Sequence, residues 1–159
     1  MSAQALFLLV RLGEDCFAID ADNVVEVVPL VRLKVVPRAP VGSAGIMSYR
    51  GDVVPVVDLN ILALGVASPS RLMTRIVIVR IDDERSARGM RLLGLLVPEV
   101  MRTSHFDPTR FVSVGLATEG ERYLGGVLLT DEGVIQRVRL SALLSDELRD
   151  ALVSPTAAA

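Results

Sequence analysis

The stretch of sequence that decides the fold is GIMSYRGDVVPVVDL, residues 45–59. Two apolar runs flank the pair Gly51 and Asp52, and a two-residue connection of this kind is typical of a tight hairpin turn in which glycine supplies the positive φ. A turn at these two residues pairs position 49 with 54, 47 with 56 and 46 with 57. The stretch therefore predicts a β-hairpin of defined register.

The two faces of this hairpin differ in chemistry, because strand side chains alternate between faces with a period of two. A core face is formed by Met47, Tyr49, Val54 and Val56. The opposite face mixes aliphatic and polar side chains, namely Ile46, Ser48, Arg50, Val53, Pro55 and Val57. Such a strip is typical of a protein–protein docking surface, although a second layer of the same chain would also cover it. Pro55 cannot donate a ladder hydrogen bond, which predicts a sheet edge or a bulge there.

The composition predicts one globular domain with a sizeable aliphatic core. The chain has 159 residues, of which 51% are hydrophobic and only 4% aromatic, with no Trp. This length is typical of one domain, and two small subdomains that share a core are also compatible with it. Seventeen basic and nineteen acidic residues give a net charge of −2, without any basic block. Nucleic acid is therefore not an expected partner.

Cysteine content and the N-terminal sequence indicate a cytoplasmic protein. Cys16 is the single cysteine, so an internal disulfide and a cysteine metal cage are excluded, and a reducing compartment is indicated. The first apolar run ends at Arg11, which is too short for a membrane span or a signal peptide.

The rest of the chain predicts many short strands and little helix. Asp58 is expected to cap a short helix that ends at Gly65, which is a structural role, and Ser145 is expected to cap a closing helix. Residues 24–28 predict a short turn of helix before Pro29. Strands are expected at residues 5–12, 16–20, 30–36, 75–81, 92–97, 123–129 and 134–140, whereas 99–107 is ambiguous. This pattern predicts a small β-barrel or sandwich.

Signatures of catalysis are missing. The chain has no Gly-x-Ser-x-Gly motif, no phosphate-binding glycine loop and one histidine, His105. Cys16 is expected to be a packing residue, because Glu14 and Asp15 beside it disfavour a thiolate. Asp52 and Asp58 would lie about 20 Å apart along a strand, too far for a catalytic carboxylate pair.

No metal or cofactor is expected either, since residues 82–84 (Asp-Asp-Glu) are typical of a solvated turn. One catalytic alternative stays open, namely a small β-barrel enzyme or ligand-binding module that uses Cys16 or His105. It requires a concave pocket around one of these two side chains.

Read together, several segments resemble the CheW family of chemotaxis coupling proteins. The matching segments, in the order and spacing of the family, are residues 7–13, 17–20 (Phe-Ala-Ile-Asp), 24–27 (Val-Val-Glu-Val), Pro37 with Pro40, 45–46, 49–51 (Tyr-Arg-Gly) and 54–59 (Val-Pro-Val-Val-Asp-Leu). The Arg-Gly pair followed by Val-Pro-Val-Val-Asp-Leu is the most specific of them.

This resemblance implies a mainly β fold of two packed five-stranded SH3-like β-barrels with a short C-terminal helix. It implies a single domain over residues 1–153, built of two intertwined barrel subdomains, with a flexible tail at 154–159. It further implies a non-catalytic adaptor that couples the cytoplasmic tips of methyl-accepting chemoreceptors to the regulatory domain of a CheA-type histidine kinase. Such a protein is cytoplasmic and is recruited to membrane-associated receptor arrays.

The resemblance also assigns candidate site residues. The receptor-contacting arginine of the family matches Arg50, and the valine and glutamate of its Val-x-Glu element match Val24 and Glu26. Glu26 lies among four valines. Its side chain is either on the solvated side of this segment or is a charged group within an apolar edge that binds a partner. With the outer face of the hairpin, the expected partner-binding surface is Arg50, Glu26, Val24, Ile46, Val53 and Val57.

Departures from the family pattern concern two regions. Ser48 and Tyr49 replace the usual Asn-Leu before Arg-Gly, and residues 102–120 fit poorly, which leaves kinase contacts there open. Residues 27–31, 49–51, 123–125 and 135–137 are more similar to the Wsp-type branch. Pathways of that branch are associated with surface sensing and a cyclic di-GMP output.

Overall fold

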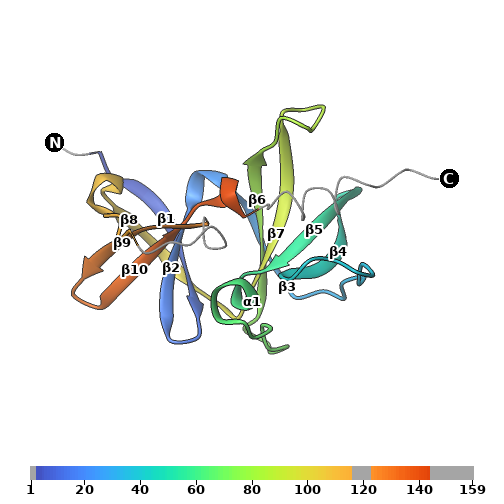
Figure 1. The fold of residues 1–159 in the computed structure, drawn as a ribbon, viewed down its shortest axis with the longest axis horizontal. Coiled ribbons are helices and arrows are strands. Elements are labelled where there is room, and N and C mark those ends of the chain that lie inside the picture. The colour runs from blue at the N-terminus through green and yellow to red at the C-terminus, as the bar shows by residue number, and fades with distance from the viewer. Residues whose placement is uncertain (1–2, 116–122, 144–159) are drawn as a thin grey trace.

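The computed structural model describes residues 3–115 and 123–143. These residues form ten strands and little helix (Figure 1). The strands are β1 (Ala5–Leu12), β2 (Asp15–Asp20), β3 (Val24–Pro29), β4 (Ser43–Tyr49), β5 (Asp52–Asp58), β6 (Arg75–Asp82), β7 (Met90–Val97), β8 (Glu99–Phe106), β9 (Leu124–Thr130) and β10 (Gly133–Val138). The helix α1 covers Leu59–Leu64, and 3₁₀ turns cover Ala21–Asn23, Pro108–Arg110 and Leu140–Ala142. Within this part of the chain, no helix is both long and apolar enough to cross a membrane.

The strands form two five-stranded sheets that lie side by side (Figure 1). One sheet has the order β8-β1-β2-β10-β9 and is called the terminal barrel; the other has the order β3-β6-β7-β5-β4 and is called the middle barrel. An isolated bridge between Lys34 and Ile46 closes the middle barrel, and one between Val112 and Val127 closes the terminal barrel. The expected mainly β fold of two five-stranded barrels is confirmed, whereas the helix expected after Ser145 lies outside the described residues.

The two barrels share one strand topology. Each contains a single parallel pair, β5 with β7 and β10 with β2, and each has a bulge in its first edge strand. The bulge lies between Val24 and Glu26 in β3 and between Val100 and Arg102 in β8. Strands β1–β5 and strands β6–β10 therefore form two structural repeats. Each repeat gives two strands to one barrel and three strands to the other.

Strand β6 shows how the core is divided. Ile76 and Ile78 point into the middle barrel, and Val77 and Val79 point into a central core to which both sheets contribute; all four are 0% exposed. A strand that is covered on both faces reads as a continuous apolar run, which explains the sequence of this strand. A third cluster, in which Phe7 packs with aliphatic side chains such as Leu9 and Ile135, fills the terminal barrel.

The turn of the β4–β5 hairpin lies one residue earlier than the sequence predicts. Tyr49 pairs with Asp52, so Arg50 and Gly51 form the turn, with φ angles of 48° and 84°. Two successive positive φ angles match the right-handed twist of the strands, which explains this choice. The register moves by an even number of residues, and the predicted core face is therefore retained: Met47, Tyr49, Val54 and Val56 are all buried in the middle barrel.

The position of β5 within its sheet corrects a second prediction. β5 lies between β4 and β7, so it is not an edge strand, and the register shift of this hairpin lies between Ser43 and Gly45 in β4 instead of at Pro55. Its pairs with β7 begin at Val56, and Pro55 therefore lies just outside that ladder, where a missing N–H is tolerated.

Two further expectations are corrected, and one segment that was ambiguous is assigned. Residues 24–28 form strand β3 instead of a helical turn, because a run of β-branched valines packs well in a sheet against β6. The strand expected at 30–36 is reduced to the bridge at Lys34, and the ambiguous residues 99–107 form β8.

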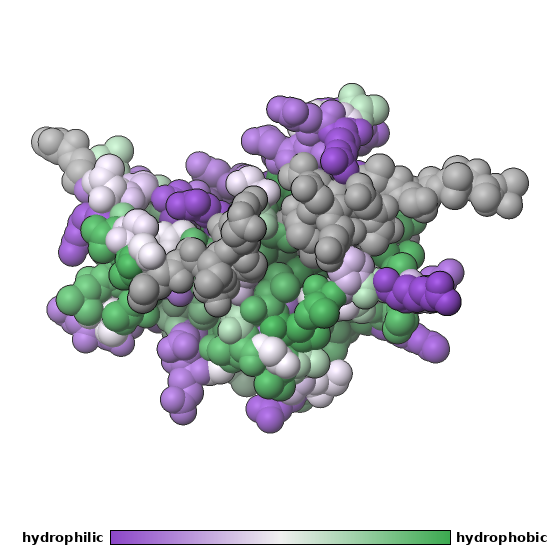
Figure 2. Space-filling model, viewed as in Figure 1, coloured by the Kyte–Doolittle hydropathy of each residue, from purple (hydrophilic) through white to green (hydrophobic). Residues whose placement is uncertain are grey.

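The β6–β7 hairpin projects from the middle barrel, and hydrophilic side chains gather at its end (Figures 1 and 2). Where β6 ends and the connecting loop begins, Asp83 is not solvated as expected: its side chain is 0% exposed and lies 2.8 Å from Nε of Arg91. The backbone N–H of Arg85 also donates to Oδ1 of Asp83, so the acidic residue orders the loop.

Candidate partner-binding site

The bulge in β3 decides where Glu26 points. Glu26 pairs with Ile78, whose side chain lies inside the middle barrel, so the Glu26 side chain lies on the same side. Val24 pairs with Val79 and packs against the central core. Because the extra residue Val25 separates them, Val24 and Glu26 lie on opposite faces of β3.

Arg50 reaches Glu26 from the β4–β5 turn. Its Nη2 donates to Oε2 of Glu26 at 3.2 Å, and its guanidinium carbon lies 5.2 Å from the centroid of the Tyr49 ring. The side chain of Arg50 is 72% exposed and that of Glu26 is 40% exposed. An exposed ion pair of this kind contributes at most about 1 kcal/mol to stability, so it does not hold the fold together.

Tyr49 is the member of the site that sequence reasoning did not assign. Its hydroxyl donates to Oε2 of Glu26, the same oxygen that accepts from Arg50, and this hydrogen bond raises the pKa of Tyr49. The residue is only 8% exposed. A signal was present in the sequence, because a tyrosine on a core face needs a partner for its hydroxyl group.

The remaining predicted site residues do not join this cluster. Val53 is 70% exposed on the outer face of the hairpin, opposite Ser48. Ile46 is half-buried, where Lys34 pairs with its backbone. Val57 was expected at the surface and this is wrong, because it is 0% exposed and packs in the central core. The chain itself covers the inner part of the outer face, and only the part near the turn stays open.

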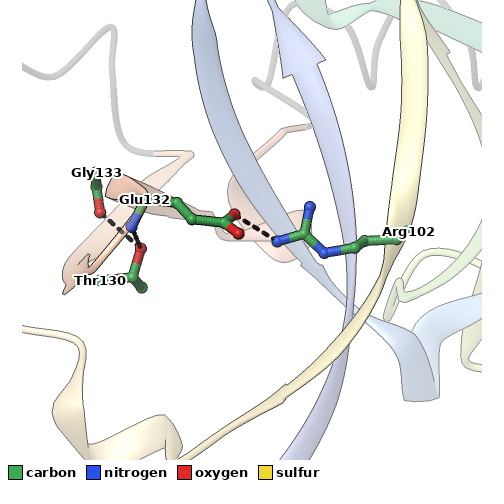
Figure 3. A network of polar contacts seen from close by, with 4 residues as sticks. All are labelled: Arg102, Thr130, Glu132 and Gly133. Carbon is green, nitrogen blue, oxygen red and sulfur yellow. Dashed lines mark hydrogen bonds and ion pairs between the residues drawn. The ribbon is translucent and has the colours of Figure 1, made fainter.

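The terminal barrel has an ion pair at the equivalent place. Arg102 follows the bulge of β8, as Glu26 follows that of β3, and its Nη2 lies 2.8 Å from Oε2 of Glu132 in the β9–β10 turn (Figure 3). The charges are inverted relative to the middle barrel. The position equivalent to Tyr49 is Thr130, since each residue closes its strand just before the turn.

A cleft of about 450 Å³ lies where the two barrels meet, lined among others by Asp20, Ile81, Phe111 and Arg137. Arg137 donates to both carboxylate oxygens of Asp20, at 3.0 and 2.6 Å, and its guanidinium lies over the rings of Phe7 and Phe111. The charges of Asp20 and Arg137 therefore compensate each other in this cleft.

Asp58 has the capping role that the sequence predicts. Its carboxylate accepts from the backbone N–H groups of Asn60 and Ile61 and from both the N–H and the hydroxyl of Ser68. Gly65 ends α1 with a φ of 74°. A carboxylate with four such donors, 2% exposed, is structural.

Neither residue of the catalytic alternative, Cys16 or His105, lines the cleft where the two barrels meet. Cys16 is half-buried on β2, and burial raises the pKa of its thiol, which disfavours a nucleophilic thiolate. His105 is exposed on β8. Within residues 3–115 and 123–143, no group of three or more His, Cys, Asp or Glu side chains is arranged to hold a metal ion.

Comparisons with known proteins agree with this architecture. The model of the CheW-like domain matches residues 6–148. A probable chemotaxis protein CheW from Rhizobium etli is 28% identical over 141 residues, which cover 86% of this chain and 84% of that protein. The crystal structure of the scaffolding protein TtCheW from Thermoanaerobacter tengcongensis superimposes with a TM-score of 0.76 at 24% identity, over 93% of this chain and 92% of that one. Because the family model spans most of the sequence, the chain belongs to the CheW-like domain family.

Proposed function

We propose that this protein is a non-catalytic adaptor that couples the cytoplasmic tips of methyl-accepting chemoreceptors to a CheA-type histidine kinase. The observation that carries the proposal is the contact between Glu26 and Arg50. Both residues match the receptor-contacting positions of the CheW family, and they meet at an exposed end of the middle barrel. The similarity to a probable chemotaxis protein CheW of Rhizobium etli supports the same role.

Receptor binding combines apolar burial with orientation by charge. Val53 supplies exposed aliphatic surface beside the turn, and Arg50 supplies hydrogen-bond donors next to it. A central arginine in such a contact contributes about 2 kcal/mol or more to binding. The regulatory domain of the kinase binds at other strand edges, so that the adaptor holds both partners at once.

The protein acts in the cytoplasm and is recruited to membrane-associated receptor arrays through these contacts. The finer proposal is a Wsp-type pathway, associated with surface sensing and with cyclic di-GMP output. It is supported by the runs at residues 27–31, 49–51, 123–125 and 135–137. Co-purification from the native cytoplasm tests it, since a diguanylate cyclase pathway alongside the receptor and kinase supports this branch and a flagellar output overturns it.

The decisive variant is Arg50→Glu. It keeps the fold, because Arg50 is exposed, and it places two carboxylates side by side where the partner docks. Sedimentation of receptor, kinase and adaptor together measures assembly, and thermal unfolding measures stability. Arg80→Glu, also exposed but on β6, is the matched control. The proposal predicts that assembly is lost only in Arg50→Glu; normal assembly by a folded Arg50→Glu protein overturns it.

A further inference from the structure

We propose that Tyr49 is a positioning residue that holds Arg50 and Glu26 together as a donor–acceptor pair for the side-chain amide of an Asn or Gln on the partner. This inference rests on the proposed function, because the partner is the receptor tip. It adds the residue that organises the site and the chemical group that the site recognises.

One rigid side chain, that of Tyr49, contacts both charged groups. The Tyr49 ring is packed in the middle barrel, and the residue is 8% exposed. Its hydroxyl holds Oε2 of Glu26, while its ring lies under the guanidinium of Arg50 at 5.2 Å. Long charged side chains otherwise lose rotamer freedom when they bind, so fixing them in advance strengthens binding.

The backbone at Arg50 supports the same conclusion. Arg50 has a φ of 48°, in the left-handed region that costs a non-glycine residue free energy. Glycine would satisfy this turn at lower cost, and an unfavourable conformation of this kind is typical of functional sites. The arginine is therefore present for its side chain.

The terminal barrel provides an internal comparison. Its equivalent pair, Arg102 and Glu132, joins β8 to the β9–β10 turn (Figure 3). Among the described residues, no cation–π contact involves Arg102. The hydroxyl of Thr130, at the position of Tyr49, donates to the carbonyl of Gly133 and accepts from the N–H of Glu132, so it serves the turn itself. Closing a barrel end does not require a tyrosine. The aromatic residue in the middle barrel therefore serves the Glu26–Arg50 pair.

The atoms left available define the partner group. Among the described residues, Oε1 of Glu26 and both Nε and Nη1 of Arg50 have no hydrogen-bond partner, so one acceptor and several donors remain side by side. A partner carboxylate would be repelled by Glu26, and a partner ammonium by Arg50. A side-chain amide carries one acceptor and two donors without net charge, which satisfies both groups together.

The positioning role is tested in the free protein with Tyr49→Phe and Tyr49→Leu. NMR relaxation of arginine Nε–H groups reports the order of Arg50, and Arg102 is the reference for an ion-paired arginine without a tyrosine. Arg50 is expected to be more ordered than Arg102 in the wild type, less so in Tyr49→Phe, and similar to Arg102 in Tyr49→Leu. Equal order of the two arginines in the wild-type protein overturns the positioning role.

Binding is then measured by calorimetry against the purified cytoplasmic tip fragment of a methyl-accepting receptor from the same genome. Loss of one hydrogen bond in Tyr49→Phe is expected to weaken binding about fivefold, with unfolding temperature unchanged. Thr130→Val in the terminal barrel is the matched control and is expected to bind normally. Wild-type affinity of Tyr49→Phe overturns the inference.

The recognised group is tested on the partner, by replacing each Asn and Gln of the receptor tip with Leu in turn. One replacement is expected to weaken binding to the wild-type adaptor, with a much smaller effect on Arg50→Ala. Absence of any such coupled position overturns amide recognition. If the wild-type adaptor does not bind the tip at all, the proposed function and amide recognition both fail, and the relaxation measurement still decides the role of Tyr49.

Discussion

Glu26 and Arg50 lie 24 residues apart in the sequence, and their side chains meet at 3.2 Å at the turn end of the middle barrel. The contact depends on two local irregularities: the bulge that turns Glu26 to the inside of the barrel and the left-handed turn that carries Arg50. Both irregularities are typical of places where a sheet directs a side chain for function. Because Arg50 adds little to the stability of the fold, its replacement is expected to change receptor binding without lowering stability.

Replacing Arg50 with Gly is expected to keep or raise stability while it abolishes receptor binding. Glycine adopts a positive φ without steric cost, which removes up to about 1 kcal/mol of strain and balances the lost surface contacts. Urea unfolding and receptor co-sedimentation measure the two effects. A clear loss of stability in Arg50→Gly would contradict the view that this side chain serves binding.

Val53 and Val57 are two residues of one strand face with opposite expected effects. Val57→Ala is expected to cost about 2 kcal/mol of unfolding free energy, because it opens a cavity in the central core. Val53→Ala is expected to leave stability unchanged and to weaken receptor binding, because its side chain is 70% exposed. Chemical unfolding of both variants checks the pair. Equal stability losses would place Val53 in the core and remove it from the surface.

The buried ion pair between Asp83 and Arg91, at the start of the β6–β7 loop, is expected to matter for stability alone. Asp83→Ala leaves Arg91, whose side chain is 19% exposed, without its counter-ion, at an expected cost of about 3 kcal/mol. Asp82→Ala is the control, since Asp82 is exposed at the adjacent position. A shift of the urea midpoint in the Asp83 variant alone is the expected result, and receptor binding of the folded variant stays normal.

The thiol of Cys16 is expected to react slowly. Burial raises its pKa above the ordinary value, partly offset by Arg102 and Arg11, so the neutral thiol persists to higher pH than in the unfolded chain. Between the unfolded and folded pKa values the folded state binds more protons, so stability falls as pH rises through that range. The pH profile of iodoacetamide alkylation measures the shift. A midpoint below that of a free cysteine would contradict this expectation.

Patterns along the chain predicted much of the fold, because they report local chemistry. The period of two of strand side chains, applied to residues 45–59, predicted the correct core face even though the turn was misplaced by one residue. Asp58 and Gly65 carried their own capping signals. The valine run at 24–28 was misread because apolar periodicity alone does not separate a short buried strand from a turn of helix.

The sequence by itself determined which side chains are apolar, where the chain turns and which residues cap α1, since these depend on neighbours within a few positions. Only the tertiary structure decided that Val57 is buried, that Tyr49 joins the site, and that Glu26 meets Arg50. Those outcomes depend on the pairing of strands from distant parts of the chain. The resulting bulge, turn and central core involve contacts that no local pattern encodes.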